Sequence, residues 1–154
     1  MILFIIAAAG VFSYMLSSLF ITQAIAEWIG TLDVNRWVLM GTINVFLIIA
    51  GFFLPPVAVI LMAAPILLPI ITTAGFDPIW FAVVLTINME IGLISPPVGL
   101  NLYVINGIAP DISLRTILVG SLPFVACMVV AIVLLCLFPG LATWLPDLIM
   151  GAAL

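Results

Sequence analysis

Charged residues are scarce in this sequence: 5% of its 154 residues are Asp, Glu, Lys or Arg, and histidine is absent. Soluble domains carry about 25% charged residues, and so few charges could not cover the surface of a soluble protein. The two basic residues, both arginines, cannot form the basic footprint that nucleic-acid binding needs. The composition therefore excludes a soluble globular domain, a disordered chain and a nucleic-acid binder.

Cysteine is also rare. Cys127 and Cys136 share one apolar run, where helical geometry would place them on opposite faces and about 13 Å apart along the axis, so they cannot form a disulfide with each other. No cluster of Cys and carboxylate residues has the spacing of a metal site. Residues 1–10 lack the positive charge of a signal peptide and their apolar run continues too far, so we expect a retained membrane span.

Long uncharged apolar runs are abundant instead. Apolar residues make up 68% of the chain; three long runs carry no charge, and a fourth contains only Glu90. A helix needs roughly 20 apolar residues to cross a hydrocarbon core, and each run is long enough. The alternation typical of membrane barrel strands is missing, so helices remain as the spanning structure. The predicted fold class is an all-α integral membrane protein, a single multi-pass domain over residues 1–154.

Two of the predicted segments are ordinary, and a short tail follows them. Residues 2–26 predict a transmembrane helix that ends at Glu27 and Trp28, because Trp prefers the headgroup level. Residues 116–138 predict a plain transmembrane helix, and residues 139–154 an interfacial tail.

Residues 37–73 are unusual because Pro55 and Pro56 interrupt an uncharged run near its middle. Proline removes a backbone donor and clashes with the preceding turn, so one helix must stop there and another begin. Each arm is about 25 Å long, slightly short for a full crossing. The segment is either two short spans with a tight turn or a re-entrant helical hairpin with its tip at membrane depth. Because no polar side chain lies near the prolines, the re-entrant hairpin is favoured.

Residues 79–109 would be about 46 Å long if fully helical, longer than the hydrocarbon core. Ser-Pro-Pro-Val-Gly at residues 95–99 interrupts them, so we expect a discontinuous transmembrane helix. Each interruption leaves free carbonyls at a helix C-terminus, which suit Na⁺, and free N–H groups at a helix N-terminus, which suit a carboxylate. Paired interruptions are typical of secondary-transporter binding sites. The alternative is that the prolines merely kink packed helices.

Polar side chains near the interruptions are candidate site residues. Asn88 and Ser95 lie on nearly one helical face, and Asn101 directly follows the second interruption, so we expect the three to line a cavity. Glu90 is the only charge inside a predicted span, about 200° around the helix from Asn88. Intramembrane acids are functional by default. Its angle favours a packed partner or a proton-linked role over direct contact with a substrate.

The first arm of the hairpin carries a stripe of four residues, Gly41, Asn44, Ile48 and Gly51. We expect Gly41 and Gly51 to permit close backbone approach. Asn44 and Asn88 have an alternative role, an interhelical hydrogen bond that holds the helices together.

Three stretches resemble a known family when they are taken in order: GFFLPPVAVILM (51–62), PILLPIITTAGFDPIWFAVVL (65–85) and MEIGLISPPVGLNLYV (89–104). They are similar to the large membrane subunit of TRAP transporters, the tripartite ATP-independent periplasmic solute transporters. The family usually has Thr where Ser95 stands, and commonly an acidic residue near Pro55. Because the chain contains one hairpin and one broken helix, it resembles the C-terminal repeat only.

The resemblance implies half of an elevator-type, Na⁺-coupled symporter in the bacterial inner membrane that imports an organic acid of the C4-dicarboxylate, sialic acid or keto acid class. It implies Na⁺ as coupling ion with no other cofactor. The implied partners, besides lipid, are a small four-span membrane subunit, a periplasmic substrate-binding protein and the remaining N-terminal repeat. It also suggests that Arg36 faces the periplasm and Arg115 the cytoplasm.

The same resemblance implies a binding site at the two interruptions. The Na⁺ ligands would come from Gly51, Leu54, Ser95, Pro97 and Gly99. The substrate carboxylate would lie beside the second interruption, near Asn88, Ser95, Pro96 and Asn101.

Other functions are also compatible with parts of the sequence. A permease like the divalent-anion/sodium symporters or the tripartite tricarboxylate transporters would share the hairpin and the broken helix. An intramembrane enzyme would use Glu90 and Asn88, but no second acid or base stands at a fitting angle. The short length leaves a truncated, non-transporting remnant or a structural membrane subunit as a further alternative.

Overall fold

The computed structural model describes residues 2–31, 35–96 and 99–150. These residues form helices and contain no strand, so the all-α prediction is confirmed for them. The helices are α1 (Ile2–Ser18), α2 (Ile21–Thr31), α3 (Arg36–Phe53), α4 (Pro56–Thr73), α5 (Pro78–Ile94), α6 (Leu100–Ile108), α7 (Leu114–Leu137) and α8 (Gly140–Met150). Of these, α3, α4 and α7 are long and apolar enough to cross a membrane, while α1 and α5 are shorter apolar helices.

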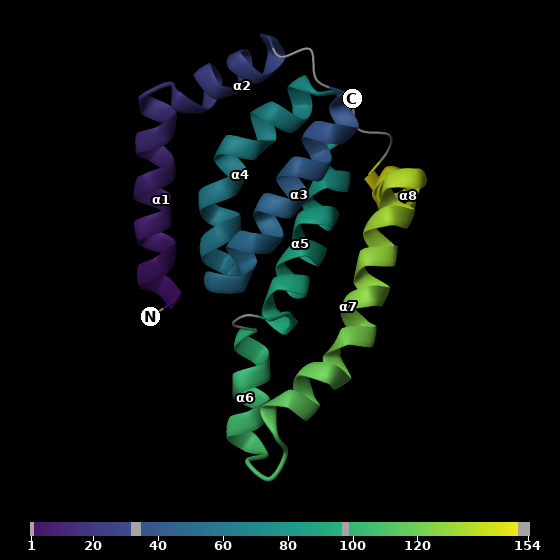
Figure 1. Cartoon of the computed structure of the whole chain (residues 1–154). Coiled ribbons are helices and arrows are strands. Elements are labelled where there is room, and N and C mark those ends of the chain that lie inside the picture. Colours follow the sequence, from purple (N-terminus) through teal and green to yellow (C-terminus); the bar gives the residue numbers. More distant parts are fainter. Residues whose placement is uncertain (1, 32–34, 97–98, 151–154) are drawn as a thin grey trace.

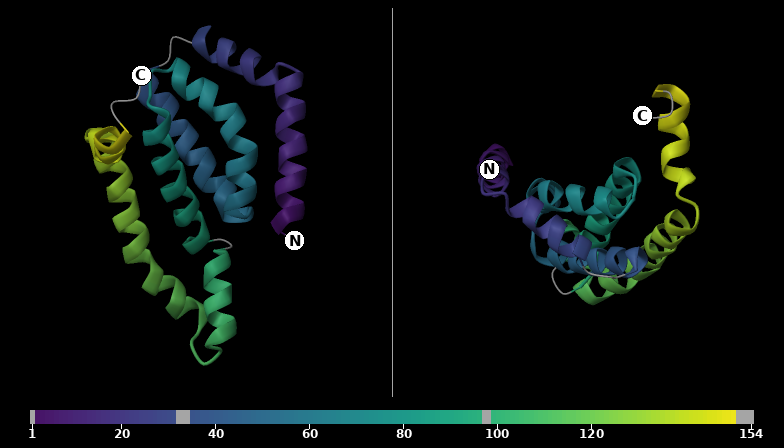
Figure 2. Two further views of the ribbon diagram at one scale, coloured as in Figure 1. Left: turned by 180° about the vertical axis from the view of Figure 1, so that it is seen from behind. Right: turned by 90° about the horizontal axis from the view of Figure 1, so that it is seen from above.

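The centre of the molecule is a group of three helices. Helices α3 and α4 form an antiparallel hairpin, and α5 runs beside α3 in the same direction as α3 (Figure 1). The most extensive packing is between α3 and α5; α1 and α2 pack on α4, and α7 packs on α5. Figure 2 shows from two further sides that α3, α4 and α5 stay together while α1 and α7 flank them.

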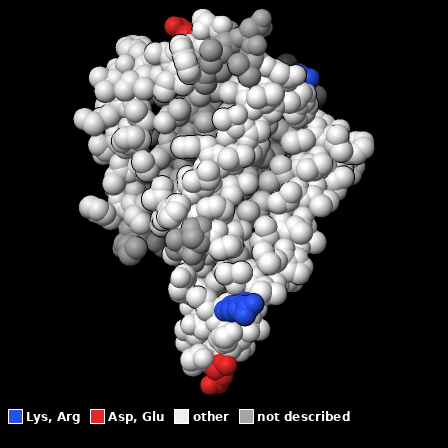
Figure 3. Space-filling model, viewed as in Figure 1, with Lys and Arg blue, Asp and Glu red and all other residues white. Residues whose placement is uncertain are grey.

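The core is small and lies where α3, α4 and α5 meet. Its fully buried side chains include Leu47, Ile71, Trp80, Phe81 and Val84. Large apolar side chains are exposed along most of the other helices. The charged side chains visible in Figure 3 lie at the two ends of the molecule, with an uncharged band between them. An apolar surface of this kind suits a hydrocarbon surrounding.

The predicted helix over residues 2–26 is wrong in its extent. The structure divides it between α1 and α2, and α2 continues to Thr31 across one end of the hairpin (Figure 1). The division has a local cause, since the Ser18 hydroxyl donates to the Met15 carbonyl and Phe20 takes a positive φ of 56°. Serine hydroxyls that bond nearby carbonyls compete with the helical ladder.

Capping and aromatic packing fix one end of the bundle. Asp77 begins α5 by accepting hydrogen bonds from the backbone N–H groups of Ile79 and Trp80. Phe76 stacks on the ring of Trp80, and the indole N–H of Trp80 donates to the carbonyl of Leu135 at 2.8 Å. This hydrogen bond joins α5 to the last turn of α7.

Candidate functional site

Two helix interruptions lie at the same end of α3 and α5. Helix α3 ends at Phe53 and α4 begins at Pro56; α5 ends at Ile94 and α6 begins at Leu100. The residues after the two helix ends, Leu54 and Ser95, have extended backbone, with φ of −116° and −105°. A following proline disfavours the helical region, so the sequence forces both helices to stop.

A glycine contact brings the two interruptions together. A Cβ on Gly92 would lie only 2.6 Å from the carbonyl carbon of Gly51, so the backbones of α3 and α5 touch there. Gly51 stands about half a turn before the end of α3, and Gly92 about half a turn before the end of α5. The two helix C-termini therefore lie side by side. Each carries partial negative charge from unpaired carbonyls, and together they favour a cation.

Asn88 joins the same two helices by a hydrogen bond. Its side-chain amide donates to Oδ1 of Asn44 and to the Val84 carbonyl, and Asn44 in turn donates to the Met40 carbonyl at 2.8 Å. Asn88 is fully buried. The structure thus provides the interhelical hydrogen bond that the sequence offered as the alternative to a cavity-lining role.

One oxygen in this contact is unsatisfied. Oδ1 of Asn88 is buried and has no hydrogen-bond partner within residues 2–31, 35–96 and 99–150. Exchanging the positions of Oδ1 and Nδ2 would not satisfy this oxygen, because Nδ2 already donates to two acceptors where it stands. A buried acceptor without a partner costs about 1–3 kcal/mol, so a donor or a cation there would be stabilising. Carbonyl ends and amide oxygens are the ligands that fit Na⁺.

Gly99 starts α6 in the left-handed conformation that the second interruption requires. Its φ is +55°, and a Cβ there would lie 2.8 Å from Cδ1 of Leu102 and 3.1 Å from the Ser95 carbonyl oxygen. L-residues with a side chain pay a steric penalty in this region, whereas glycine does not. Gly99 therefore fits both the turn and the space.

Ser95 is 6% exposed and lies inside the second interruption. Ser121 of α7 contacts the end of α5 just before this interruption. The Ser121 hydroxyl donates to the carbonyls of Leu118, in its own helix, and of Ile94, the last residue of α5. Sequence reasoning did not single out Ser121 or Gly92. Gly92 could have been found, because it follows Asn88 by one helical turn and precedes Ser95 on the same face.

The remaining predicted site residues differ in their burial. Pro96 and Asn101 are exposed, whereas Asn88 and Ser95 are buried, and the cavity shared by Asn88, Ser95 and Asn101 stays a prediction. Gly41 is exposed and a Cβ there would meet nothing within 4 Å, so the predicted close approach at Gly41 is wrong. Leu54 is 45% exposed beside the hairpin turn. Pro97 lies outside the described residues.

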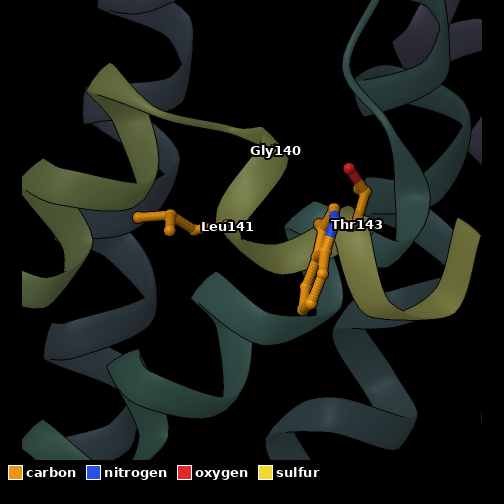
Figure 4. A pocket seen from close by; sticks show the side chains of 4 residues that line it. Gly140, Leu141 and Thr143 are labelled. Atoms are coloured by element: carbon orange, nitrogen blue, oxygen red, sulfur yellow. The ribbon is translucent and has the colours of Figure 1, made fainter. Parts of the chain in front are cut away.

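Neither Gly51 nor Gly92 is among the lining residues of two hollows in the described surface. One, of about 520 Å³, is lined on α8 by Gly140, Leu141, Thr143 and Trp144; Figure 4 shows the side chains of Leu141 and Thr143 pointing in different directions. Another, of about 210 Å³, lies between α1, α3 and α4 and has eight lining residues, all apolar. The side chains of this lining offer no polar group to hold an ion or a carboxylate.

The comparisons with known proteins decide the family. The family model described as "Tripartite ATP-independent periplasmic transporter, DctM component" matches residues 1–141. The chain belongs to this family. It is also 38% identical over 147 residues to the C4-dicarboxylate TRAP transporter large permease protein DctM of Pseudomonas aeruginosa, covering 96% of this chain and 34% of that protein.

Other relatives within the DctM family are named for different substrates. The chain is 32% identical to the sialic acid TRAP transporter large permease protein SiaM of Vibrio cholerae, covering 92% of this chain and 33% of the relative. It is 34% identical to the ectoine TRAP transporter large permease protein TeaC of Halomonas elongata, covering 96% of this chain and 34% of the relative. The chain thus spans about a third of the length of these curated relatives. All three are transporter subunits rather than enzymes.

Proposed function

We propose that this chain forms the C-terminal part of the large permease subunit of a TRAP transporter, and that the complete transporter imports an organic acid by symport with Na⁺. The observation that carries the proposal is the Gly51–Gly92 contact, because it sets the C-termini of two interrupted helices side by side. This arrangement concentrates partial negative charge where a coupling cation is needed.

Na⁺ would be held by oxygen atoms of this region. The described candidates are Gly51, Leu54, Ser95 and Gly99. Gly51 lies at the helix contact, Ser95 is buried in the second interruption, and Gly99 shapes the turn. Oδ1 of Asn88 is buried and has no hydrogen-bond partner in the part of the chain that the structure describes, which supports a further oxygen ligand or a bound water nearby. Na⁺ is the only coupling ion in this proposal, and no other cofactor takes part.

The substrate carboxylate would bind beside the second interruption, at the N-terminus of α6. The first N–H groups of α6 lack partners within the helix and carry partial positive charge. Neither arginine lies near the N-terminus of α6 in the chain, because Arg36 is the first residue of α3 and Arg115 lies in the first turn of α7. Backbone groups of α6 would therefore supply the local attraction for the anion.

The membrane arrangement is part of the same proposal. The α3–α4 hairpin would be re-entrant, and α5 with α6 would be one discontinuous span, both in the bacterial inner membrane. The interrupted elements would move as half of an elevator-type transport domain. The rest of the large subunit, a small membrane subunit and a periplasmic substrate-binding protein would complete the transporter, in line with the family to which the chain belongs.

Uptake in proteoliposomes tests this function. The chain is reconstituted with the rest of the permease subunit, the small subunit and the substrate-binding protein, and radiolabelled C4-dicarboxylate, sialic acid and ectoine are offered with and without a Na⁺ gradient. We expect uptake of one solute that collapses when choline replaces Na⁺. Uptake unchanged by the removal of Na⁺ would contradict Na⁺ coupling.

A further inference from the structure

Helix α5 leaves one narrow face uncovered by the rest of the described chain. Ala82, Thr86 and Glu90 recur one helical turn apart, all three are exposed, and we call them the α5 open stripe. Asn88 and Gly92, on another face, are buried against α3. Within the described residues, Glu90 makes no hydrogen bond or ion pair.

The open stripe differs from the exposed faces of α3 and α7 in one group, the carboxyl of Glu90. Exposed positions of α3 include Val45, Phe46 and Ile49, and those of α7 include Val129 and Val130, all of which suit lipid tails. The open stripe instead presents a methyl group, a threonine and a carboxyl group. The Thr86 hydroxyl donates to the Ala82 carbonyl at 2.9 Å, so it needs no outside partner and adds only small bulk. Small residues let another helix backbone approach closely.

Glu90 makes a lipid contact for this stripe unfavourable. It lies inside α5, about one turn before the helix ends at Ile94, so the proposed membrane arrangement places it within the hydrocarbon region. A carboxyl group facing lipid is strongly disfavoured unless it finds a donor. The two arginines lie near the starts of α3 and α7, and the chain has no lysine. A partner for Glu90 must therefore come from outside this chain or from a polar neutral group.

We propose that the α5 open stripe is the docking face for a helix from the rest of the large permease subunit, and that this helix offers a hydrogen-bond donor to Glu90. The inference rests on the proposed function, since it needs α5 to stand in the membrane. The relative lengths indicate which helix covers the open stripe. The curated relatives are about three times as long as this chain, so most of such a subunit lies outside it. The helix packs on Ala82 and Thr86 and reaches Glu90 with an amide, hydroxyl or basic group.

Lipid exposure measured by spin labelling tests the contact without using transport. Single cysteines at Thr86 and, as the matched control on α7, at Val130 are introduced after Cys127→Ala and Cys136→Ala, and each is labelled with a nitroxide in the complete permease subunit in liposomes. We expect collisions with dissolved oxygen to be several-fold fewer at position 86 than at position 130. Equal collision rates would mean that the stripe faces lipid and would overturn the proposal.

Substitution of Glu90 should change the yield of assembled permease in opposite directions, depending on whether the side chain faces lipid or a buried donor. Glu90→Leu should raise the yield of assembled permease if the side chain faces lipid. If a donor is buried against it, the same change should lower the yield about tenfold, because the donor loses its acceptor. We expect the loss, and we expect Glu90→Gln, which keeps an acceptor oxygen, to assemble within about twofold of the parent. A higher yield for Glu90→Leu would contradict the docking face.

A distance measurement identifies a different occupant. Dipolar coupling between nitroxides at position 86 of two copies would assign the stripe to a homo-oligomeric contact, which would also overturn the proposal. These readouts are independent of uptake. A protected stripe in a permease that shows no Na⁺-dependent uptake would leave the docking face intact and contradict only the proposed function.

Discussion

At the scale of single residues, two glycines decide how closely α3 and α5 approach. Their contact is asymmetric: a Cβ on Gly92 would lie 2.6 Å from Gly51 backbone, whereas a Cβ on Gly51 would lie 3.4 Å from Cα of Gly92. The first distance requires the backbones to move, and the second is close to an ordinary contact. Glycine is therefore required mainly at position 92.

We expect Gly92→Ala to lower the stability of the protein by about 1–3 kcal/mol, because the added methyl group overfills a backbone contact. Gly51→Ala should cost clearly less. Gly41→Ala is the matched control, since Gly41 is an exposed helix residue with open space, and alanine is the better helix former by about 1 kcal/mol. Thermal unfolding in detergent measures all three. Equal losses at positions 51 and 92 would contradict the asymmetry.

The Asn44–Asn88 hydrogen bond is the second feature at this scale. A double-mutant cycle with Asn44→Ala and Asn88→Ala should give a coupling of about 0.6 kcal/mol, the average for such bonds inside membranes. The measurement is the change in unfolding free energy of the two single variants and the double variant. Strictly additive losses would show that the two amides act independently.

At the scale of helices, the second interruption depends on Gly99. Its φ of +55° is strained for any side chain, and Leu102 and the Ser95 carbonyl occupy the space that a Cβ would need. Gly75 has a similar φ of +78° at the turn after α4, but nothing lies within 4 Å of its Cβ position. The two glycines differ in space and in location rather than in backbone strain.

We therefore expect Gly99→Val to abolish Na⁺-dependent uptake by the complete transporter, because the turn between α5 and α6 cannot form around it. Gly75→Ala should cost about 1–2 kcal/mol of stability and leave the Na⁺ dependence of uptake unchanged. Initial uptake rates at several Na⁺ concentrations check both variants. Parent-like uptake by Gly99→Val would remove this turn from the binding site.

Trp80 joins α5 to α7 at the other end of the bundle. Trp80→Phe keeps an aromatic ring beside Phe76 but removes the hydrogen bond to the Leu135 carbonyl. We expect a loss of about 1 kcal/mol in the free energy of unfolding. Trp37→Phe is a control, because Trp37 also packs edge-on against Phe76, through a ring contact that phenylalanine can keep. A loss equal to that control would show that the indole N–H contributes nothing.

At the scale of the whole molecule, the two arginines lie at opposite ends of the bundle. Helices α3 and α7 begin at opposite ends, so Arg36 and Arg115 lie at opposite ends as well (Figure 1). The charged side chains visible in Figure 3 also gather at the ends. One arginine at each end gives the positive-inside rule no preference.

Labelling from one side of the membrane checks this arrangement. In a variant without Cys127 and Cys136, we expect Asn35→Cys to react with an impermeant maleimide from the periplasmic side, and Asp111→Cys to react only after permeabilisation. Both positions are exposed in the structure. Reaction of both from the same side would contradict the transmembrane arrangement, and the reverse pattern would contradict only the orientation.

Much of the fold follows from local chemistry that the sequence displays. The double prolines end α3 and α5 because the restriction acts on the residue directly before each proline, whatever the surroundings. The apolar character of the helices is also local, because it is set by the uncharged residues of each run. The break between α1 and α2 was missed because Ser18 and Phe20 act through a side-chain bond and a positive φ, which apolar periodicity does not display.

The sequence alone determined the family, the apolar helices and the two places where they stop, because these depend on local sequence and on motif order. Only the tertiary structure decided that Gly92 rather than Gly41 contacts Gly51. It also decided that the buried Asn88 donates a hydrogen bond to Asn44, and that Ser121 contacts the end of α5. Each of these depends on which faces of separate helices meet, and that choice is made by packing of the whole bundle rather than by any one segment.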